Sequence, residues 1–115
     1  MCKLCRGDNK ISAEVSKELK ALIHNLVRKY PISRIILYGS FSRGDFHQGS
    51  DIDLIVVGDF KERFFQRIGL ILNEHKGKHD LEPLVYTNAE FRKMAKEKRS
   101  LVTNAMKNGI TIYQK

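Results

Sequence analysis

The sequence predicts a small α/β fold in which a short mixed sheet is flanked by helices. Segments whose apolar residues recur every three or four positions alternate with short apolar runs, in the order helix, strand, strand, helix, strand, helix, helix, strand. The length of 115 residues suits one domain. We therefore expect a single domain over residues 10–115, preceded by a flexible tail at residues 1–9.

The first half of the chain supplies one helix and two strands. The helix is expected to begin at Ser12, a residue type that caps helix N-termini, and to stop before Pro31. Its apolar stripe comprises Val15, Leu19, Leu22, Ile23, Leu26 and Val27. Residues 34–38 and 51–57 are short apolar runs, and they are expected to form buried strands.

A second helix should follow the second strand. Asp59 is its expected cap, and Glu62 three residues later completes the pattern of a capping box. The residues expected to face inward are Phe64, Phe65, Ile68, Ile71 and Leu72. A polar break at residues 75–80 ends this helix.

The last third of the chain opens with a third strand at residues 81–87. Pro83 within it indicates an edge position or a bulge, because proline cannot donate to the ladder. Thr87 and Glu90 form another capping box. The remaining elements are a helix over residues 88–100, a helix over residues 100–108 that stops at Gly109, and a strand over residues 110–113.

The net charge of +8 favours an anionic partner such as a nucleotide, a nucleic acid or an acidic protein. The basic residues at positions 92–99 are expected to form a solvated helix face. The apolar runs are too short for a membrane span, and the N-terminus lacks the apolar region of a signal peptide. We therefore expect a cytoplasmic protein that does not enter a membrane.

Cys2 and Cys5 form a lone CxxC motif in a polar segment. No second pair of cysteines completes a zinc knuckle, and the motif does not follow a predicted strand as a redox CxxC would. Two interpretations stay open: a tail with two reduced thiols, or a zinc half-site completed by a partner or a second copy.

Two aspartates lie inside the second predicted strand. Residues two apart in a strand share a face, so Asp51 and Asp53 point the same way while Ile52, Leu54 and Val56 point into the core. At about 5 Å and an effective dielectric near 20, their repulsion costs roughly 3 kcal/mol. A divalent cation between them would offset this cost, and Mg²⁺ prefers such hard oxygen ligands.

A Gly-Ser turn after the first strand supplies groups suited to phosphate. Gly39 allows the backbone to approach a phosphate closely, and both the amide and the hydroxyl of Ser40 can donate hydrogen bonds to it. Arg43 is a candidate phosphate clamp nearby.

Taken together, the Gly-Ser pair, ten further residues and then Asp-Ile-Asp at positions 51–53 resemble the signature of the DNA polymerase β-like nucleotidyltransferase superfamily. The small size and the ending NAMKNGITIY resemble its minimal nucleotidyltransferase (MNT) branch. The resemblance extends from about residue 12 to residue 113, and it implies the polymerase β-like nucleotidyltransferase fold.

This resemblance implies a site of three carboxylates and two Mg²⁺ or Mn²⁺ ions that transfers a nucleoside monophosphate, with AMP from ATP the expected case. Gly39, Ser40 and Arg43 would bind the triphosphate. Asp51 and Asp53 would bind both metal ions. The third acid is expected at Glu82, where the family usually has aspartate, and it would bind metal or serve the acceptor hydroxyl as a base; Asp80 is the alternative.

The chain leaves little room for an acceptor-binding domain, so the acceptor hydroxyl is expected on another polypeptide. The MNT resemblance implies a small helical HEPN protein, a toxin that the MNT protein neutralises as an antitoxin by adenylylating it. Two alternatives stay open: a catalytically weak subunit that binds nucleotide or occludes a toxin, and a nucleic-acid binding module. The last is less favoured because aromatic residues do not interleave with the basic ones as stacking platforms.

Overall fold

The structure is a computed structural model that describes residues 13–39, 51–77 and 80–115. Its helices are α1 (Ala13–Lys29), α3 (Phe64–Glu74), α4 (Asn88–Lys96) and α5 (Ser100–Asn108). Its strands are β1 (Ile32–Tyr38), β2 (Ile52–Gly58), β3 (Leu81–Tyr86) and β4 (Ile110–Gln114). This mixture of a small sheet and flanking helices confirms the predicted fold class, while Ser12, Ser40, Arg43 and the two cysteines lie outside the described residues.

The four strands form one mixed sheet in the order β3-β2-β1-β4. Strand β1 runs antiparallel to both β2 and β4, whereas β2 and β3 are parallel and are joined through α3. Strand β3 lies at the edge of the sheet, so the missing N–H of Pro83 does not interrupt hydrogen bonding between interior strands. The edge position that Pro83 predicted is confirmed.

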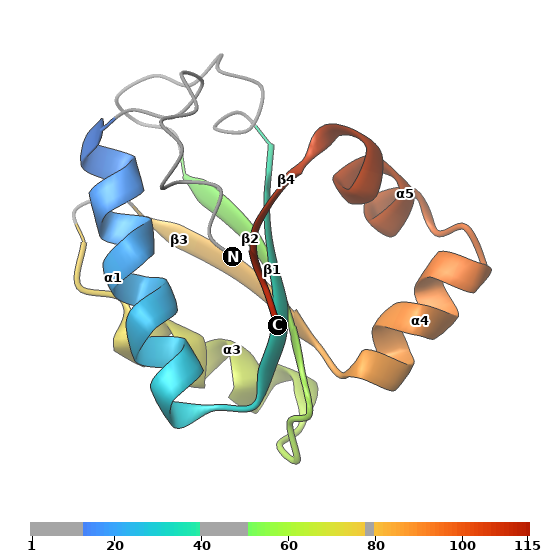
Figure 1. Ribbon diagram of the computed structural model, residues 1–115. Helices are drawn as coiled ribbons and strands as arrows, with labels where there is room; N and C mark the ends of the chain where they lie inside the picture. The colour runs from blue at the N-terminus through green and yellow to red at the C-terminus, as the bar shows by residue number, and fades with distance from the viewer. Residues whose placement is uncertain (1–12, 40–50, 78–79) are drawn as a thin grey trace.

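Helices cover both faces of the sheet, with α1 and α3 on one side and α4 and α5 on the other (Figure 1). The α1–α3 side is the larger core, in which Leu19 and Leu26 of α1 pack with the odd-numbered residues Ile35 and Leu37 of β1. On the α4–α5 side, Ile36, Ile55 and Val57 pack with Phe91 and Val102. Both faces of β2 are therefore apolar along most of its length, with Asp53 at one end.

Helix α3 corrects two predictions. The side chain of Phe65 is 84% exposed and that of Leu72 is 44% exposed, although both were expected to face inward. The buried face instead carries Arg67 and Ile71, which are four positions apart on the helix. On α1, Val27 is likewise 37% exposed and lies at the border of the apolar stripe.

The capping box predicted at Asp59 and Glu62 is wrong, because α3 begins only at Phe64. Phe60 is buried against the Tyr30 ring, with 5.9 Å between ring centroids, and this contact lies in the non-helical segment that precedes the helix. Asp59 instead accepts a hydrogen bond from Asn88 Nδ2 at 2.7 Å.

The other predicted capping box is confirmed. Glu90 N donates to Thr87 Oγ1 at 3.1 Å, and Thr87 N donates to Glu90 Oε1 at 2.9 Å. Helix α5 ends at Asn108, and Gly109 N donates to Ala105 O at 2.8 Å, as expected for a stop at this glycine. None of the described helices is both long and apolar enough to cross a membrane.

Arg67 joins the two helical layers around the edge strand. From α3 it donates to Val85 O of β3 at 3.3 Å and to Glu90 Oε1 of α4 at 2.7 Å. Its Nε also donates to Glu62 O at 2.7 Å. This network fixes β3, which carries Glu82, between α3 and α4.

Candidate active site

Three acidic residues gather at one end of β2. The antiparallel register places Asp53 of β2 beside Tyr38, the last residue of β1. The parallel register places Glu82 of β3 beside Asp53 on the other side. Because paired residues in adjacent strands point to the same face, these side chains all lie on the α4–α5 side of the sheet. Asp51 immediately precedes β2.

The electrostatics of Glu82 show how close the three carboxyl groups are. Hydrogen bonding to the Asp51 side chain, and next to the Asp53 side chain, raises the pKa of Glu82 above its ordinary value of 4.5. Repulsion from the charges of both aspartates acts in the same direction. Glu82 therefore holds a proton more readily than an isolated glutamate, because two other carboxyl groups lie close to it.

Tyr38 is a part of this site that the sequence analysis did not single out. Burial, followed by the charges of Asp53, Tyr86 and Glu82, raises the pKa of Tyr38 to about 12. The phenol is therefore neutral at neutral pH and can donate a hydrogen bond beside the carboxylates. Its position directly before Gly39, at the end of a predicted strand, was the available sequence signal.

Gly39 turns the chain at the end of β1 with a φ of 76°, a left-handed conformation that favours glycine. A Cβ built at this position would collide with the Asp53 carboxylate. The backbone of the predicted phosphate-binding turn thus lies directly against the acidic cluster. The other two predicted triphosphate ligands, Ser40 and Arg43, lie outside the described residues.

Asp80, the alternative third acid, has an exposed side chain at the entrance to β3. Its backbone carbonyl accepts a hydrogen bond from Ile52 N at 2.8 Å, which begins the pairing of β2 with β3. The groups that shift the pKa of Glu82 are Asp51 and Asp53. The structure therefore brings Glu82, of the two candidates, into contact with the aspartate pair.

The donor set suits a hard divalent cation, because it consists of carboxylate oxygens with excess negative charge. In the described part of the chain, no three His, Cys, Asp or Glu side chains are already arranged as a metal-binding group. Two predicted neighbours of the cluster, Ser40 and Arg43, are not among the described residues. The fit of the carboxylates to such an ion therefore rests on their chemistry and their charge.

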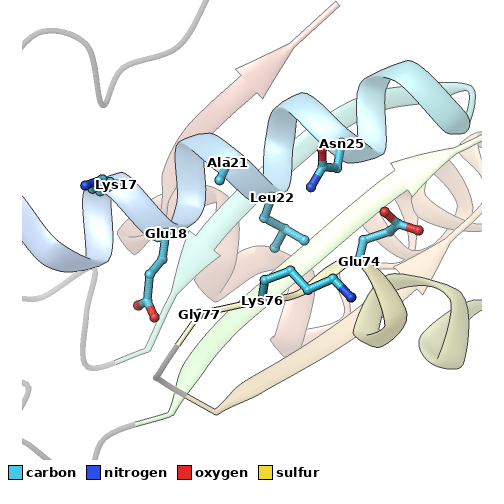
Figure 2. A pocket seen from close by; sticks show the side chains of 8 residues that line it. All are labelled: Lys17, Glu18, Ala21, Leu22, Asn25, Glu74, Lys76 and Gly77. Atoms are coloured by element: carbon cyan, nitrogen blue, oxygen red, sulfur yellow. The ribbon is translucent and has the colours of Figure 1, made fainter.

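A cavity of about 390 Å³ lies on the opposite side of the sheet, between α1 and the segment that follows α3. Figure 2 shows Leu22 on its floor, with Glu18 directed toward Gly77 and Lys76 extending toward Glu74. Glu74 also forms an ion pair with Lys29, with 3.0 Å between Oε2 and Nζ. Acidic and basic side chains are balanced around this cavity, and it does not adjoin the acidic cluster.

The model of the family described as "Nucleotidyltransferase domain" matches residues 19–111, which is most of the chain. The chain belongs to the nucleotidyltransferase domain family. Its acidic cluster and Gly39 turn lie within the matched range, and the helix–sheet arrangement is the one this nucleotidyltransferase shares with solved relatives.

Two similar proteins come from Methanocaldococcus jannaschii. "Putative protein adenylyltransferase MJ0604" is 47% identical to this nucleotidyltransferase over 45 residues, which are 37% of this chain and 45% of that protein. "Putative protein adenylyltransferase MJ0141" is 33% identical over 79 residues, which are 64% of this chain and 77% of that protein. The match to the first thus spans less than half of its length.

Two solved structures share the fold. A structure described as that of a "putative nucleotidyltransferase from Sulfolobus solfataricus" aligns with a TM-score of 0.58 and 17% identity, covering 95% of this chain and 94% of that one. A structure described as a toxin-antitoxin with AMP-PNP aligns with a TM-score of 0.53 and 20% identity, covering 94% of this chain and 75% of that one. At these identities the likeness supports the fold and does not carry over activities.

Proposed function

We propose that this nucleotidyltransferase transfers AMP from ATP to a hydroxyl group of a partner protein. The observation that carries the proposal is the pairing of Glu82 with Asp53 in the β2–β3 register, which assembles three carboxylates beside the Gly39 turn. Similarity to two relatives named as protein adenylyltransferases supports a protein as the acceptor.

Each residue has a proposed role. Asp51, Asp53 and Glu82 would hold two Mg²⁺ ions, or Mn²⁺, and Gly39, Ser40 and Arg43 would hold the triphosphate. The ions would supply neutralisation of the phosphate charge. The acceptor oxygen attacks the α-phosphorus, the bond from that phosphorus to the bridging oxygen breaks, and pyrophosphate leaves.

The acceptor hydroxyl must lose its proton in this reaction, and Glu82 is the proposed recipient. Its carboxyl group lies beside the two aspartates, so it can reach a hydroxyl group bound at the same cluster. Glu82 is also exposed at the edge strand, where a side chain of another protein can approach it. Tyr38, which stays neutral, would help to orient the carboxylates.

The proposed partner is a small helical HEPN protein, which this chain would neutralise as an antitoxin. The MNT-like sequence pattern supports this pairing, as does the fold shared with a structure described as a toxin-antitoxin with AMP-PNP. A glutamate at position 82 also keeps a second candidate open, in which the chain occludes its partner without transfer.

The deciding experiment incubates the chain with ATP labelled at the α-phosphate, Mg²⁺ and a helical partner encoded beside it. We expect label on the partner, loss of labelling with Asp53→Asn, and retained labelling with the matched control Asp80→Asn. Neutralisation of the partner without label would favour occlusion. Failure to bind ATP at all would refute the nucleotide site.

A further inference from the structure

A second cavity, of about 470 Å³, lies between α4 and the sheet, and we call it the α4 cavity. It is lined near the start of β1 by Arg34, which pairs with Val57 at the far end of β2 from Asp53. Arg34 and Tyr38 are separated by about 13 Å along β1, at about 3.3 Å per residue. The buried side chains of Ile36 and Ile55 occupy the face between them. The α4 cavity is therefore separate from the acidic cluster.

The charged side chains that line the α4 cavity are all basic: Arg34, Arg92 and Lys115. In the described part of the chain, no carboxylate forms an ion pair with either arginine. The α1–α3 cavity differs, because Lys17 and Lys76 there are matched by Glu18 and Glu74. Uncompensated arginines that face a cavity favour an anion inside it.

Arg34 is held in place before any ligand arrives. Its guanidinium carbon lies 6.0 Å from the centroid of the Phe91 ring, and its Nη1 lies 3.5 Å from Met106 Sδ. These contacts restrain the side chain through the Phe91 ring and one weak sulfur acceptor, so most of the guanidinium N–H donors remain for a ligand. A restrained guanidinium loses less entropy on binding than a mobile lysine would.

The rest of the lining selects the kind of anion. Val57, Phe91 and Met106 provide an apolar and aromatic wall, and Asn88, whose amide nitrogen donates to Asp59, and Gln114 also line the cavity. A volume of about 470 Å³ is in the usual range for a small-molecule site. Phosphate groups match the donor geometry of arginine, and planar organic groups pack well on aromatic rings.

We propose that the α4 cavity binds a phosphomonoester the size of a nucleoside monophosphate. Its phosphate contacts Arg34 and Arg92, and its organic part lies against Val57, Phe91 and Met106. This site does not depend on the proposed transfer reaction, because its residues lie at the other end of the sheet from Gly39 and the carboxylates.

The experiment measures binding of AMP to the full chain in metal-free buffer containing EDTA, where unneutralised carboxylates disfavour phosphate at the acidic cluster. Titration calorimetry compares the wild-type chain, Arg92→Gln and Arg34→Gln with Lys93→Gln, an exposed basic residue of the same helix that does not line the cavity. We expect each arginine variant to bind AMP roughly tenfold more weakly or worse, as for loss of one charge-assisted hydrogen bond. Lys93→Gln should stay within about twofold, since screening makes a distant surface charge weak.

Amide chemical shifts locate the ligand, and we expect AMP to move Asn88 and Gln114 rather than Gly39 and Asp53. Arg92 is exposed, so Arg92→Gln keeps the test valid if Arg34→Gln folds poorly. The proposal fails if AMP does not bind, if Arg92→Gln binds it like wild type, or if the shifts cluster at Gly39. Equal affinity for adenosine, or for inorganic phosphate, also overturns it, as does an acidic peptide that binds this cavity when AMP does not.

Discussion

Replacing Arg67 by methionine tests the network that joins the two helical layers. Methionine fills most of the space of the arginine stem, while the hydrogen bonds to Glu62 O, Val85 O and Glu90 Oε1 are lost. Arg67 is only 7% exposed, so water can replace the lost donor for some of its partners and not for others. The side chain of Glu90 is 45% exposed and can be rehydrated, whereas the Val85 carbonyl is buried beneath the arginine.

These contacts set the size of the effect. Breaking a buried ion pair costs about 3–5 kcal/mol, and this range falls to roughly 2–3 kcal/mol here because Glu90 regains water and methionine is easily buried. For a chain of this length, that loss lowers the melting temperature by about 8–15 °C. Glu97→Gln is the matched control, because it removes the exposed Glu97–Arg99 pair and should change stability by less than about 0.5 kcal/mol.

The assay is urea and thermal unfolding followed by circular dichroism, repeated across acidic pH. Burial raises the pKa of Glu90, but hydrogen bonds from Thr87 and the Arg67 guanidinium outweigh it and leave the pKa below 4.5. The unfolded chain thus binds this proton more tightly, so the contribution is present above pH 4.5 and is lost as pH falls through the folded pKa. Arg67→Met should therefore lose less of its stability than wild type as the pH falls through this range. A variant that is as stable as wild type, and that loses the same stability at acidic pH, would refute the network.

Three further predictions concern the acidic cluster. Asp53→Asn, like Asp51→Asn, should abolish transfer yet leave the metal-free protein folded and equally or slightly more stable, which unfolding curves without metal will show; an unfolded variant would mean that the pair is structural. Glu82→Gln should slow single-turnover transfer by roughly 10²–10⁴ while ATP still binds, whereas Asp80→Asn should have a small effect; the reverse order would identify Asp80 as the third acid. Millimolar ATP with Mg²⁺ should raise the melting temperature while either alone does little, since both are needed to complete the site; no shift would count against a nucleotide site.

Periodicity predicted the helices and strands well, because each buried face is encoded by nearby residues. The start of α3 escaped this reasoning because burial of Phe60 against Tyr30 competes with the local capping signal at Asp59. Arg67 escaped it because its partners Val85 and Glu90 lie 18 and 23 residues away.

The site shows the same division between local and distant information. Alternation along one strand was enough to place Asp51 and Asp53 on one face. Contact with Glu82 depends on the β2–β3 register, which the sequence does not specify locally. Tyr38 was missed because an aromatic residue at the end of an apolar strand is indistinguishable from core until its neighbours are known.

Because β2 and β3 pair in parallel, the acidic cluster is complete only when the two strands are in their native register. A slip of β3 by one residue would turn Glu82 to the α1–α3 side and bring Leu81 or Pro83 toward Asp53. Helix α3 separates β2 from β3 in the sequence, so the pairing of these strands is a non-local event that local structure alone cannot complete. A chain that is only partly folded therefore has its aspartates but lacks the third carboxylate beside them. Competence for chemistry at this cluster would arise only once β3 has paired with β2 in its native register.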